Sequence, residues 1–252
     1  GILLKSMVIF EKVKNRFKNW QAELFGYPSR ELNLKKLGDY DSYWRARRGG
    51  QMGELNLMQK KRLDIISSII KKESGSDKVS VADIGCGDGA ILYNLKNQIN
   101  MGRMIGVDVS KEALESAGRF CVETLEQDVG KELPQADYLM LLETLEHVSD
   151  SEKLLKRACE ASGRGVFFSV PNSGYLRHRL RFLFGKFPLQ WRIMPNEHLR
   201  FWTTADMLWW LKALGFSGFR LIFYGGVGGL NRLLPSLFAE GLLVYIRKNA
   251  SL

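Results

Sequence analysis

A glycine-rich loop is the part of this 252-residue chain whose residue types most clearly suit ligand binding. The stretch Val81–Ala90 reads Val-Ala-Asp-Ile-Gly-Cys-Gly-Asp-Gly-Ala and joins an apolar, strand-like run to a helix-like run. Glycines at such a junction let a ligand approach the backbone at the N-terminus of the helix, where N–H groups face it. The candidate contacts are Asp83, Gly85, Cys86, Gly87 and Gly89.

A second acidic residue extends this candidate site. Gly85 and Gly87, followed by Ala90, satisfy the dinucleotide-binding fingerprint. Asp108 ends the next predicted strand, at the distance where a carboxylate binds ribose hydroxyls. These residues alone are also compatible with a dinucleotide as the ligand. Asp83 favours a different ligand, because a carboxylate before the first glycine repels a pyrophosphate and attracts an ammonium group.

The order of the motifs resembles that of the class I S-adenosylmethionine-dependent methyltransferases. Glycine recurs at every second position of the loop, and Glu126–Val129 with the following Leu-Pro pair resembles the family's acidic loop on the adenine side. Leu141–Val148 resembles the segment that includes the end of the fourth strand, so the similarity covers residues 79–171 in unbroken order. It implies S-adenosylmethionine as the cofactor and S-adenosylhomocysteine as its product.

The same resemblance implies roles for individual residues. Asp108 would bind the ribose hydroxyls, with Val109 beside it in the cofactor site. Asp128 would accept a hydrogen bond from the adenine amine, and Val129 would supply backbone contacts and an apolar wall. The glycine loop would line the methionine part of the cofactor. Glu143 would close the site after the fourth strand.

Histidines are the candidate bases for the reaction. Methyl transfer is an in-line displacement at carbon, so the protein positions the reactants and supplies a base where the acceptor is a hydroxyl. His147 follows the fourth predicted strand, where ligands bind in open α/β sheets, although a helix cap or a place beneath the cofactor would also suit it. His198 is the second candidate. His178, which lies between two arginines, is predicted to belong to a basic surface.

Cysteine spacing and hydropathy exclude several classes of protein. The three cysteines, Cys86, Cys121 and Cys159, are widely spaced and form no Cys-x-x-Cys pair. This pattern excludes a disulfide scaffold or a zinc site and suits a reducing cytoplasm, so no metal site is predicted. No run of about 18 apolar residues predicts a membrane-spanning helix, and the N-terminus is not predicted to be a signal peptide.

Apolar strands alternate with helices after residue 76, which predicts a mostly parallel sheet covered on both faces. The fold class is α/β: a Rossmann-like class I methyltransferase with a mostly parallel seven-stranded sheet, an N-terminal helical cap and an insertion after the fifth strand. We divide the chain into a cap segment, 1–60, and a methyltransferase domain, 61–252, with a lid-like insertion at 172–200. The predicted strands are 79–84, 104–109, 121–126, 138–142, 165–170, 219–224 and 242–247, and the main predicted helices are 55–72, 90–99, 111–117, 151–161 and 203–214.

The net charge of +10 is concentrated in the flanking segments. Residues 1–60 carry 12 basic and 6 acidic side chains and residues 172–200 carry 6 and 1, whereas residues 61–171 carry 14 and 18. One interpretation is a two-part cap with solvated charges. The other is that segments 1–25 and 175–192 bind an anionic or apolar acceptor, or touch an anionic membrane surface. No nucleic-acid-binding module is recognised, which disfavours nucleic acid as a partner.

A looser resemblance leaves two function classes open. The segment Ser169–Gly174 and the later His198-Leu199 pair are similar to the MetW-like methyltransferases of methionine biosynthesis. The first function is methyl transfer from S-adenosylmethionine to a small-molecule oxygen or nitrogen acceptor. The alternative is a MetW-like regulatory protein that binds the cofactor and modulates a partner enzyme. Tyr43-Trp44-Arg45 resembles the aromatic-basic segments that fold over such cofactors, so Tyr43 is a further candidate contact.

Overall fold

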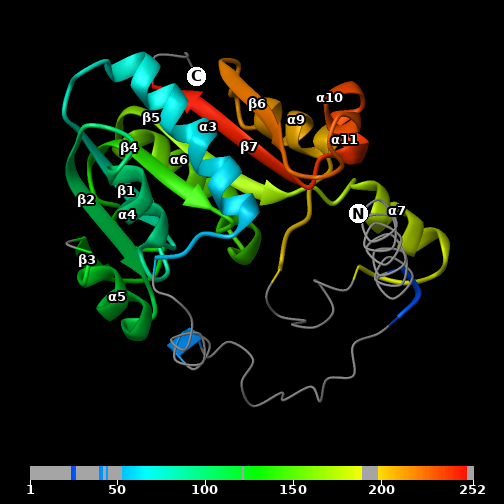
Figure 1. The fold of residues 1–252 in the computed structure, drawn as a ribbon, viewed down its shortest axis with the longest axis horizontal. Coiled ribbons are helices and arrows are strands. Elements are labelled where there is room, and N and C mark those ends of the chain that lie inside the picture. The colour runs from blue at the N-terminus through cyan, green and yellow to red at the C-terminus, as the bar shows by residue number, and fades with distance from the viewer. Residues whose placement is uncertain are drawn as a thin grey trace, which may run out of the picture.

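The computed structural model describes residues 24–26, 40–41, 44, 53–120, 122–188 and 198–248. A sheet of seven strands forms the centre of this part of the chain (Figure 1). The strands are β1 (Val79–Ile84), β2 (Met101–Asp108), β3 (Glu123–Glu126), β4 (Ala136–Leu142), β5 (Ser162–Pro171), β6 (Phe219–Tyr224) and β7 (Gly241–Arg247). Their order is β3-β2-β1-β4-β5-β7-β6, and only β7 runs antiparallel to its neighbours.

Helices cover both faces of the sheet. Helices α3 and α4 contribute to one buried apolar cluster, and α6 and α9 contribute to the other. None of the helices in the described residues has the length and apolar character needed to cross a membrane. The helices are α3 (Leu57–Ser74), α4 (Ala90–Lys96), α5 (Lys111–Gly118), α6 (Ser151–Ala161), α7 (Leu176–Leu183), α9 (Thr204–Ala213), α10 (Leu230–Leu233) and α11 (Pro235–Phe238), with a 3₁₀ turn η2 (Leu145–His147).

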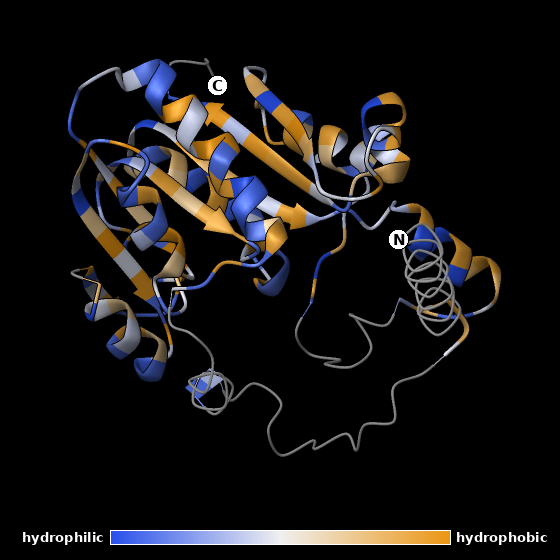
Figure 2. Ribbon diagram, in the orientation of Figure 1, coloured by the Kyte–Doolittle hydropathy of each residue, from blue (hydrophilic) through white to orange (hydrophobic). Residues whose placement is uncertain are grey.

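The central strands β1, β4, β5 and β7 are largely apolar because they are buried on both faces. In β1, Val79 and Val81 point into the cluster with α3 and α4, whereas Ala82 and Ile84 point into the cluster with α6 and α9. Figure 2 shows the same contrast as mostly hydrophobic central strands between helices of mixed character. A parallel sheet covered in this way needs no polar alternation along its strands. This two-sided burial confirms the predicted α/β fold and its mostly parallel sheet.

Several element boundaries differ from the predicted ones. The domain boundary placed after residue 60 falls inside α3, because Asn56 caps that helix: its side chain accepts from the Gln59 N–H, and the Gln59 side chain accepts from the Asn56 N–H, both at 2.9 Å. Strand β2 begins at Met101, three residues earlier than predicted, because Met101 still pairs with Val79. Thr203 is the cap of α9, and Asp206 completes its capping box.

The lid-like insertion contains α7, which is anchored by buried polar side chains. Arg181 is 1% exposed, and its guanidinium donates to the carbonyl oxygens of Leu24 (3.0 Å) and Phe187 (2.9 Å). His178, one turn earlier on the same face, is also buried. Burial, with Arg177 and Arg181, lowers the pKa of His178 to about 4. The prediction that His178 belongs to a basic surface is therefore wrong, because that face of α7 turns inward.

A single asparagine joins the start of the insertion to the short C-terminal helices. Asn172 is fully buried, and its amide donates to the carbonyl oxygens of Ser236 (3.0 Å) and Ala239 (2.8 Å). Its side-chain oxygen accepts from the Gly174 N–H at 3.0 Å. These bonds tie α11 to the turn before α7, beyond the carboxyl end of β5 (Figure 1). Of the predicted N-terminal cap segment, 1–60, the structure describes residues 24–26, 40–41, 44 and 53–60, and the rest lies outside the described residues.

Candidate active site

The glycine loop connects β1 to α4 at the carboxyl edge of the parallel strands. Gly85, Gly87 and Gly89 have φ values of 81°, 55° and 75°, a region that disfavours side chains. A Cβ on Gly89 would also lie 2.9 Å from the Cα of Ala117 in α5. The Gly85 N–H donates to the carbonyl of Val107 in β2 at 2.7 Å. Backbone conformation and the close approach of α5 therefore require the alternating glycines.

The side chain of Cys86 lies beneath this loop. It is 6% exposed, and its Sγ lies 2.8 Å from the position that a Cβ on Gly106 would occupy. Burial, followed by the charges of Asp83 and Asp108, raises the pKa of the thiol well above its ordinary value. Cys86 is therefore a neutral thiol that packs on β2 beneath the loop and donates to the Gly87 carbonyl at 3.5 Å.

Asp108 ends β2 and holds the glycine loop. Its Oδ2 accepts from the Gly87 N–H and its Oδ1 from the Ser110 N–H, each at 2.9 Å. Burial raises its pKa, and the two N–H groups oppose that rise. Each carboxylate oxygen has about two lone-pair sites, so further acceptor capacity remains for hydroxyl groups.

An aromatic residue and an acid from before α3 pack against this end of the sheet. The indole of Trp44 lies on Gly87, at the position that a side chain there would fill. Asp41 accepts from the Ser110 hydroxyl at 2.5 Å, and its charge adds to the rise in the pKa of Asp108. Tyr43 lies outside the described residues.

The loop after β3 forms the adjacent part of the crevice edge. The Gln127 N–H donates to the Asp108 carbonyl at 3.1 Å, so the loop begins beside the end of β2. Asp128 is exposed, with its Oδ1 accepting from the Gly130 N–H at 2.6 Å. Val129 is half-buried, whereas Val109 is 45% exposed. The structure thus brings Asp108 and the loop that carries Asp128 to neighbouring strand ends.

Asp83 is a buried carboxylate at the end of β1. It is 2% exposed, and its Oδ1 has no hydrogen-bond partner among the described residues. Burial raises its pKa to about 7, Arg62 opposes that rise, and Asp108 adds to it. A buried carboxylate with an unsatisfied oxygen is a natural partner for a cationic group.

Glu143 follows β4 in a strained conformation with φ 56°. Its Oε1 accepts three hydrogen bonds, from Arg62 Nη1 at 2.9 Å, the Ser169 hydroxyl at 2.8 Å and the Tyr224 hydroxyl at 3.0 Å. Burial lowers the pKa of Arg62, but Glu143 and Tyr224 raise it more, so it ends above its ordinary value. Three elements, α3, β5 and β6, therefore fix the place of Glu143.

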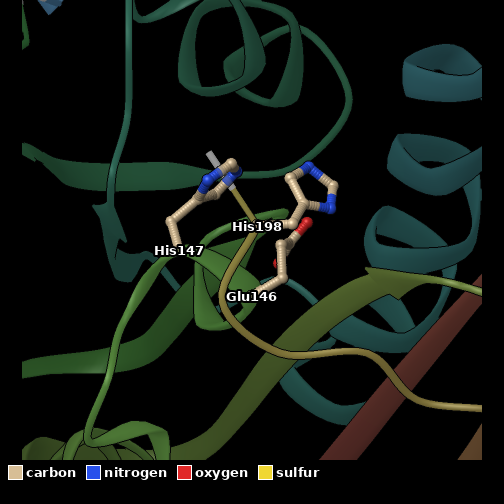
Figure 3. Close-up of side chains that lie close together, drawn as sticks. All are labelled: Glu146, His147 and His198. Atoms are coloured by element: carbon tan, nitrogen blue, oxygen red, sulfur yellow. The ribbon is translucent and has the colours of Figure 1, made fainter. Parts of the chain in front are cut away.

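The two candidate bases converge next to this position. The rings of His147 and His198 are 4.7 Å apart and nearly perpendicular. Glu146, which is 1% exposed, lies beside them, and one ligand-type atom from each of the three residues lies within 4.8 Å of the others (Figure 3). Burial and His147 lower the pKa of His198 to about 4, against an opposing effect of Glu143. Asp150, rather than His147, caps α6, so the helix-cap interpretation of His147 is wrong.

Residues 55–219 match the sequence profile of a methyltransferase domain family. This chain belongs to that methyltransferase family. Its fold is that of class I, S-adenosylmethionine-dependent methyltransferases, which together with the family match confirms the predicted superfamily and cofactor.

Individual relatives are distant. The methyltransferase chain is 26% identical over 162 residues to a ubiquinone biosynthesis O-methyltransferase of Escherichia coli O157:H7, and the match covers 58% of this chain and 65% of that protein. A magnesium protoporphyrin IX methyltransferase from Synechocystis PCC 6803, solved with S-adenosylhomocysteine, has a TM-score of 0.57 at 16% identity and covers 84% of this chain and 96% of that one. The plantazolicin methyltransferase BpumL has a TM-score of 0.61 at 13% identity, with 93% and 99% coverage.

Sequence reasoning missed four residues of this methyltransferase site: Arg62, Glu146, Ser169 and Tyr224. Arg62 had a usable signal, because it precedes Ile66 and Ile70 by four and eight residues and so shares their buried helix face. Glu146 directly precedes a histidine that sequence analysis had selected. The cysteine pattern predicted no metal site, yet metal-ligating side chains of other types gather at Glu146.

Proposed function

We propose that this protein transfers a methyl group from S-adenosylmethionine to a hydroxyl oxygen of a small, largely apolar molecule. The meeting of His147 and His198 at the cofactor edge carries the proposal. Thr144 connects the segment that carries His147 to the glycine loop. Its hydroxyl donates to the Ile84 carbonyl at 2.9 Å, and its side chain packs on Gly85. The curated relative is named an O-methyltransferase, which supports an oxygen acceptor.

The described residues fit S-adenosylmethionine, which when bound supplies an electrophilic methyl group on a sulfonium. The unsatisfied Oδ1 of Asp83 suits the ammonium of its methionine part, and the glycine loop leaves room for the chain of that part. Asp108 would accept from the ribose hydroxyls and Asp128 from the adenine amine. Glu143 would hold the wall between cofactor and acceptor, because α3, β5 and β6 fix its carboxylate.

The neighbours of the two histidines favour an apolar acceptor with one polar group. Leu199 and Phe201, on either side of Arg200, are 51% and 42% exposed. Phe201 also lies 6.3 Å from the His198 ring. An acceptor that packs on these side chains would place its hydroxyl at the histidines. The low pKa of His198 keeps its ring neutral at pH 7, so an unprotonated ring nitrogen can accept a hydrogen bond from that hydroxyl.

The direct test uses S-adenosylmethionine with a labelled methyl group and two matched acceptor sets, alkyl-substituted phenols and the corresponding anilines. We expect labelled methyl ethers from the phenols and little or no product from the anilines. Product from the anilines alone would overturn the oxygen assignment. Cofactor binding by calorimetry without turnover on either set, or on a cell extract, would instead support the MetW-like regulatory alternative.

Cofactor affinity is expected to rise with pH between 6 and 8. Asp83 has its folded pKa raised to about 7, so it is largely protonated at pH 6 and ionised at pH 8, when it attracts the ammonium. We expect up to about a tenfold gain in affinity from this ionisation, and Asp83→Asn should abolish the gain. The stability of the unliganded protein changes with pH in the opposite direction. The folded pKa of Asp83 lies above its unfolded value, so the contribution of Asp83 to the free energy of unfolding falls as pH rises from 3.8 to about 7. Calorimetric titrations at a series of pH values measure this gain in affinity. The same pH dependence of cofactor affinity in the unaltered protein and in Asp83→Asn would contradict the ammonium assignment.

We further propose that the insertion contacts an anionic membrane surface. The exposed apolar residues of this region lie beside basic ones, a combination typical of interfacial helices. We expect the protein to sediment with anionic vesicles at low salt and to be released as salt rises. Replacing both Phe182 and Leu183 with Ser should reduce sedimentation, whereas Leu57→Ser on α3 should not. Equal sedimentation of both variants would contradict the assignment. The exposed residues are Phe182 (49%), Leu183 (76%), Phe184 (49%) and Phe187 (43%).

A further inference from the structure

We infer that Glu146, His147 and His198 form a binding site for one divalent transition-metal ion. The site stands on the geometry of these residues, and only its role in the reaction rests on the proposed function. Figure 3 shows the two imidazoles and the carboxylate directed toward a common region from two separate chain segments. Within the described residues, these three side chains bring their ligand-type atoms close enough together to hold one ion.

The spacing suits a metal after a small closing movement. The three ligand-type atoms lie within 4.8 Å of one another. Two ligands on a tetrahedral ion, each about 2.1 Å from it, are about 3.4 Å apart. A change of side-chain torsion in His198, which is half-buried, can supply the difference without moving the backbone.

The backbone is already arranged to keep the three side chains together. The N–H groups of Leu199 and Arg200 donate to the Glu146 carbonyl at 2.7 and 3.2 Å, so the segment that carries His198 is bonded to the turn that carries His147. The guanidinium of Arg200 donates to the Ser149 carbonyl at 2.6 Å and to the carboxylate of Glu152 at 3.2 and 3.1 Å. A metal site preorganised in this way loses little conformational entropy on binding.

The turn itself is fixed from the other side. The Ser151 hydroxyl lies 2.8 Å from the carbonyls of Leu145 and Val148, and Thr144 is held on β1 through its bond to Ile84. These contacts hold the backbone on both sides of Glu146, whose side chain is 1% exposed. Burying a carboxylate at this place costs free energy that a bound cation would offset.

The ligand types select the kind of ion. Two imidazoles and one carboxylate leave open coordination positions, as in catalytic zinc sites of the two-histidine, one-glutamate type. Imidazole also suits Fe²⁺, Ni²⁺ and Cu²⁺, whereas Mg²⁺ and Ca²⁺ prefer sites made of oxygen atoms. We therefore assign the site to a first-row transition-metal dication rather than to Mg²⁺ or Ca²⁺.

In the proposed reaction, the ion would take the place of a protein base. A hydroxyl bound at an open position loses its proton more readily, because the dication stabilises the oxyanion. The oxyanion forms a bond to the methyl carbon as the carbon–sulfur bond breaks, the electron pair of that bond stays on sulfur as a neutral thioether, and the hydroxyl proton passes to water. His147 and His198 then serve as ligands, and their ring nitrogens are not available as bases.

The test uses Co²⁺ as a spectroscopic probe of the full chain after removal of metals by a chelator. We expect one equivalent of Co²⁺ to bind with visible d–d absorption bands, and Zn²⁺ to displace it. His198→Ala and Glu146→Gln should each weaken Co²⁺ binding by at least about 100-fold. His178→Ala is the matched control, because it removes the remaining histidine outside the cluster and should leave the bands unchanged. Melting curves show whether each variant is folded. We expect His198→Ala to fold, since the side chain of His198 is half-buried.

Absence of Co²⁺ bands, or bands unchanged in the folded His198→Ala protein, would overturn the site. Methyl transfer that is unaffected by chelation, in a protein that binds Co²⁺, would overturn its role in ionising the acceptor. Both results leave the proposed function intact if labelled methyl ether still forms. Failure of methyl transfer to every acceptor, with Co²⁺ and S-adenosylmethionine both bound, would contradict the proposed function and not the metal site.

Discussion

Replacing Asp108 with Ala is expected to weaken S-adenosylmethionine binding by at least about 100-fold. A carboxylate that accepts from two ribose hydroxyls contributes about 1.5–3 kcal/mol for each hydrogen bond to the charged group, and about 1.4 kcal/mol is a tenfold change in affinity. The substitution has a second effect, since the N–H groups of Gly87 and Ser110 lose their acceptor at 2.9 Å. Both effects act on binding. Calorimetry with the cofactor and with S-adenosylhomocysteine measures them.

A matched control separates loss of the ribose contact from a general loss of charge. Asp77 is exposed, pairs with Arg164 at 3.1 Å, and precedes β1 at the opposite edge of the sheet. Asp77→Ala should bind the cofactor as the unaltered protein does. Asp108→Asn keeps the size of the side chain and should recover only part of the affinity. Cofactor binding that survives Asp108→Ala unweakened would contradict the ribose assignment.

The parts of this protein that were predictable from sequence are those where local and tertiary requirements agree. Val79, Val81, Ala82 and Ile84 are apolar because both faces of β1 are buried, and the glycines after the strand are needed by the positive φ of the loop. A strand followed by such a loop has few alternative structures. The same agreement holds for Asp108, since its place at a strand end determines its distance from the loop.

The histidine cluster was not predictable, although two of its members were selected. His147 and His198 are separated by 50 residues, and their meeting depends on two hydrogen bonds from the backbone of residues 199–200 to the Glu146 carbonyl. Such bonds leave no pattern in side-chain type. Glu146 was overlooked for a related reason, because a glutamate in a short turn is usually exposed and this one is buried.

The insertion was misread because charge suggested exposure. The arginines of α7 indicated a solvated basic face, but Arg181 is buried and donates to backbone carbonyls. An arginine offers five donors and can satisfy several loop carbonyls at once. Composition does not distinguish an arginine that faces water, such as the exposed Arg179, from one that binds backbone carbonyls, such as the buried Arg181.

Replacing Arg62 with Met is expected to lower the free energy of unfolding by about 3 kcal/mol, because it leaves buried acceptors without their cation. Arg62 is 5% exposed and donates to Glu143, Ser169 and Tyr224 at 2.9–3.3 Å. This loss of stability lies near the lower end of the range for breaking a buried ion pair, since the side chain of Glu143 is 35% exposed and water can reach it. Asp83 limits the loss further, because without Arg62 its pKa rises and it takes up a proton.

Thermal unfolding measures this change, with a fall of about 6–12 °C in Tm for a chain of this size. Lys61→Met is the matched control on the same helix, because Lys61 is exposed and its substitution should change stability by less than about 0.5 kcal/mol. The double variant Arg62→Met with Glu143→Gln should be more stable than the sum of the single changes predicts, since it removes both charges of the pair. Strict additivity of the two substitutions would show that Arg62 does not stabilise the protein through Glu143, and would assign the loss to its other buried contacts, which include its bonds to Ser169 and Tyr224. Recovery in the double variant, by contrast, would show that the buried guanidinium and the Glu143 carboxylate stabilise each other, which links this carboxylate at the cofactor edge to a single residue of α3.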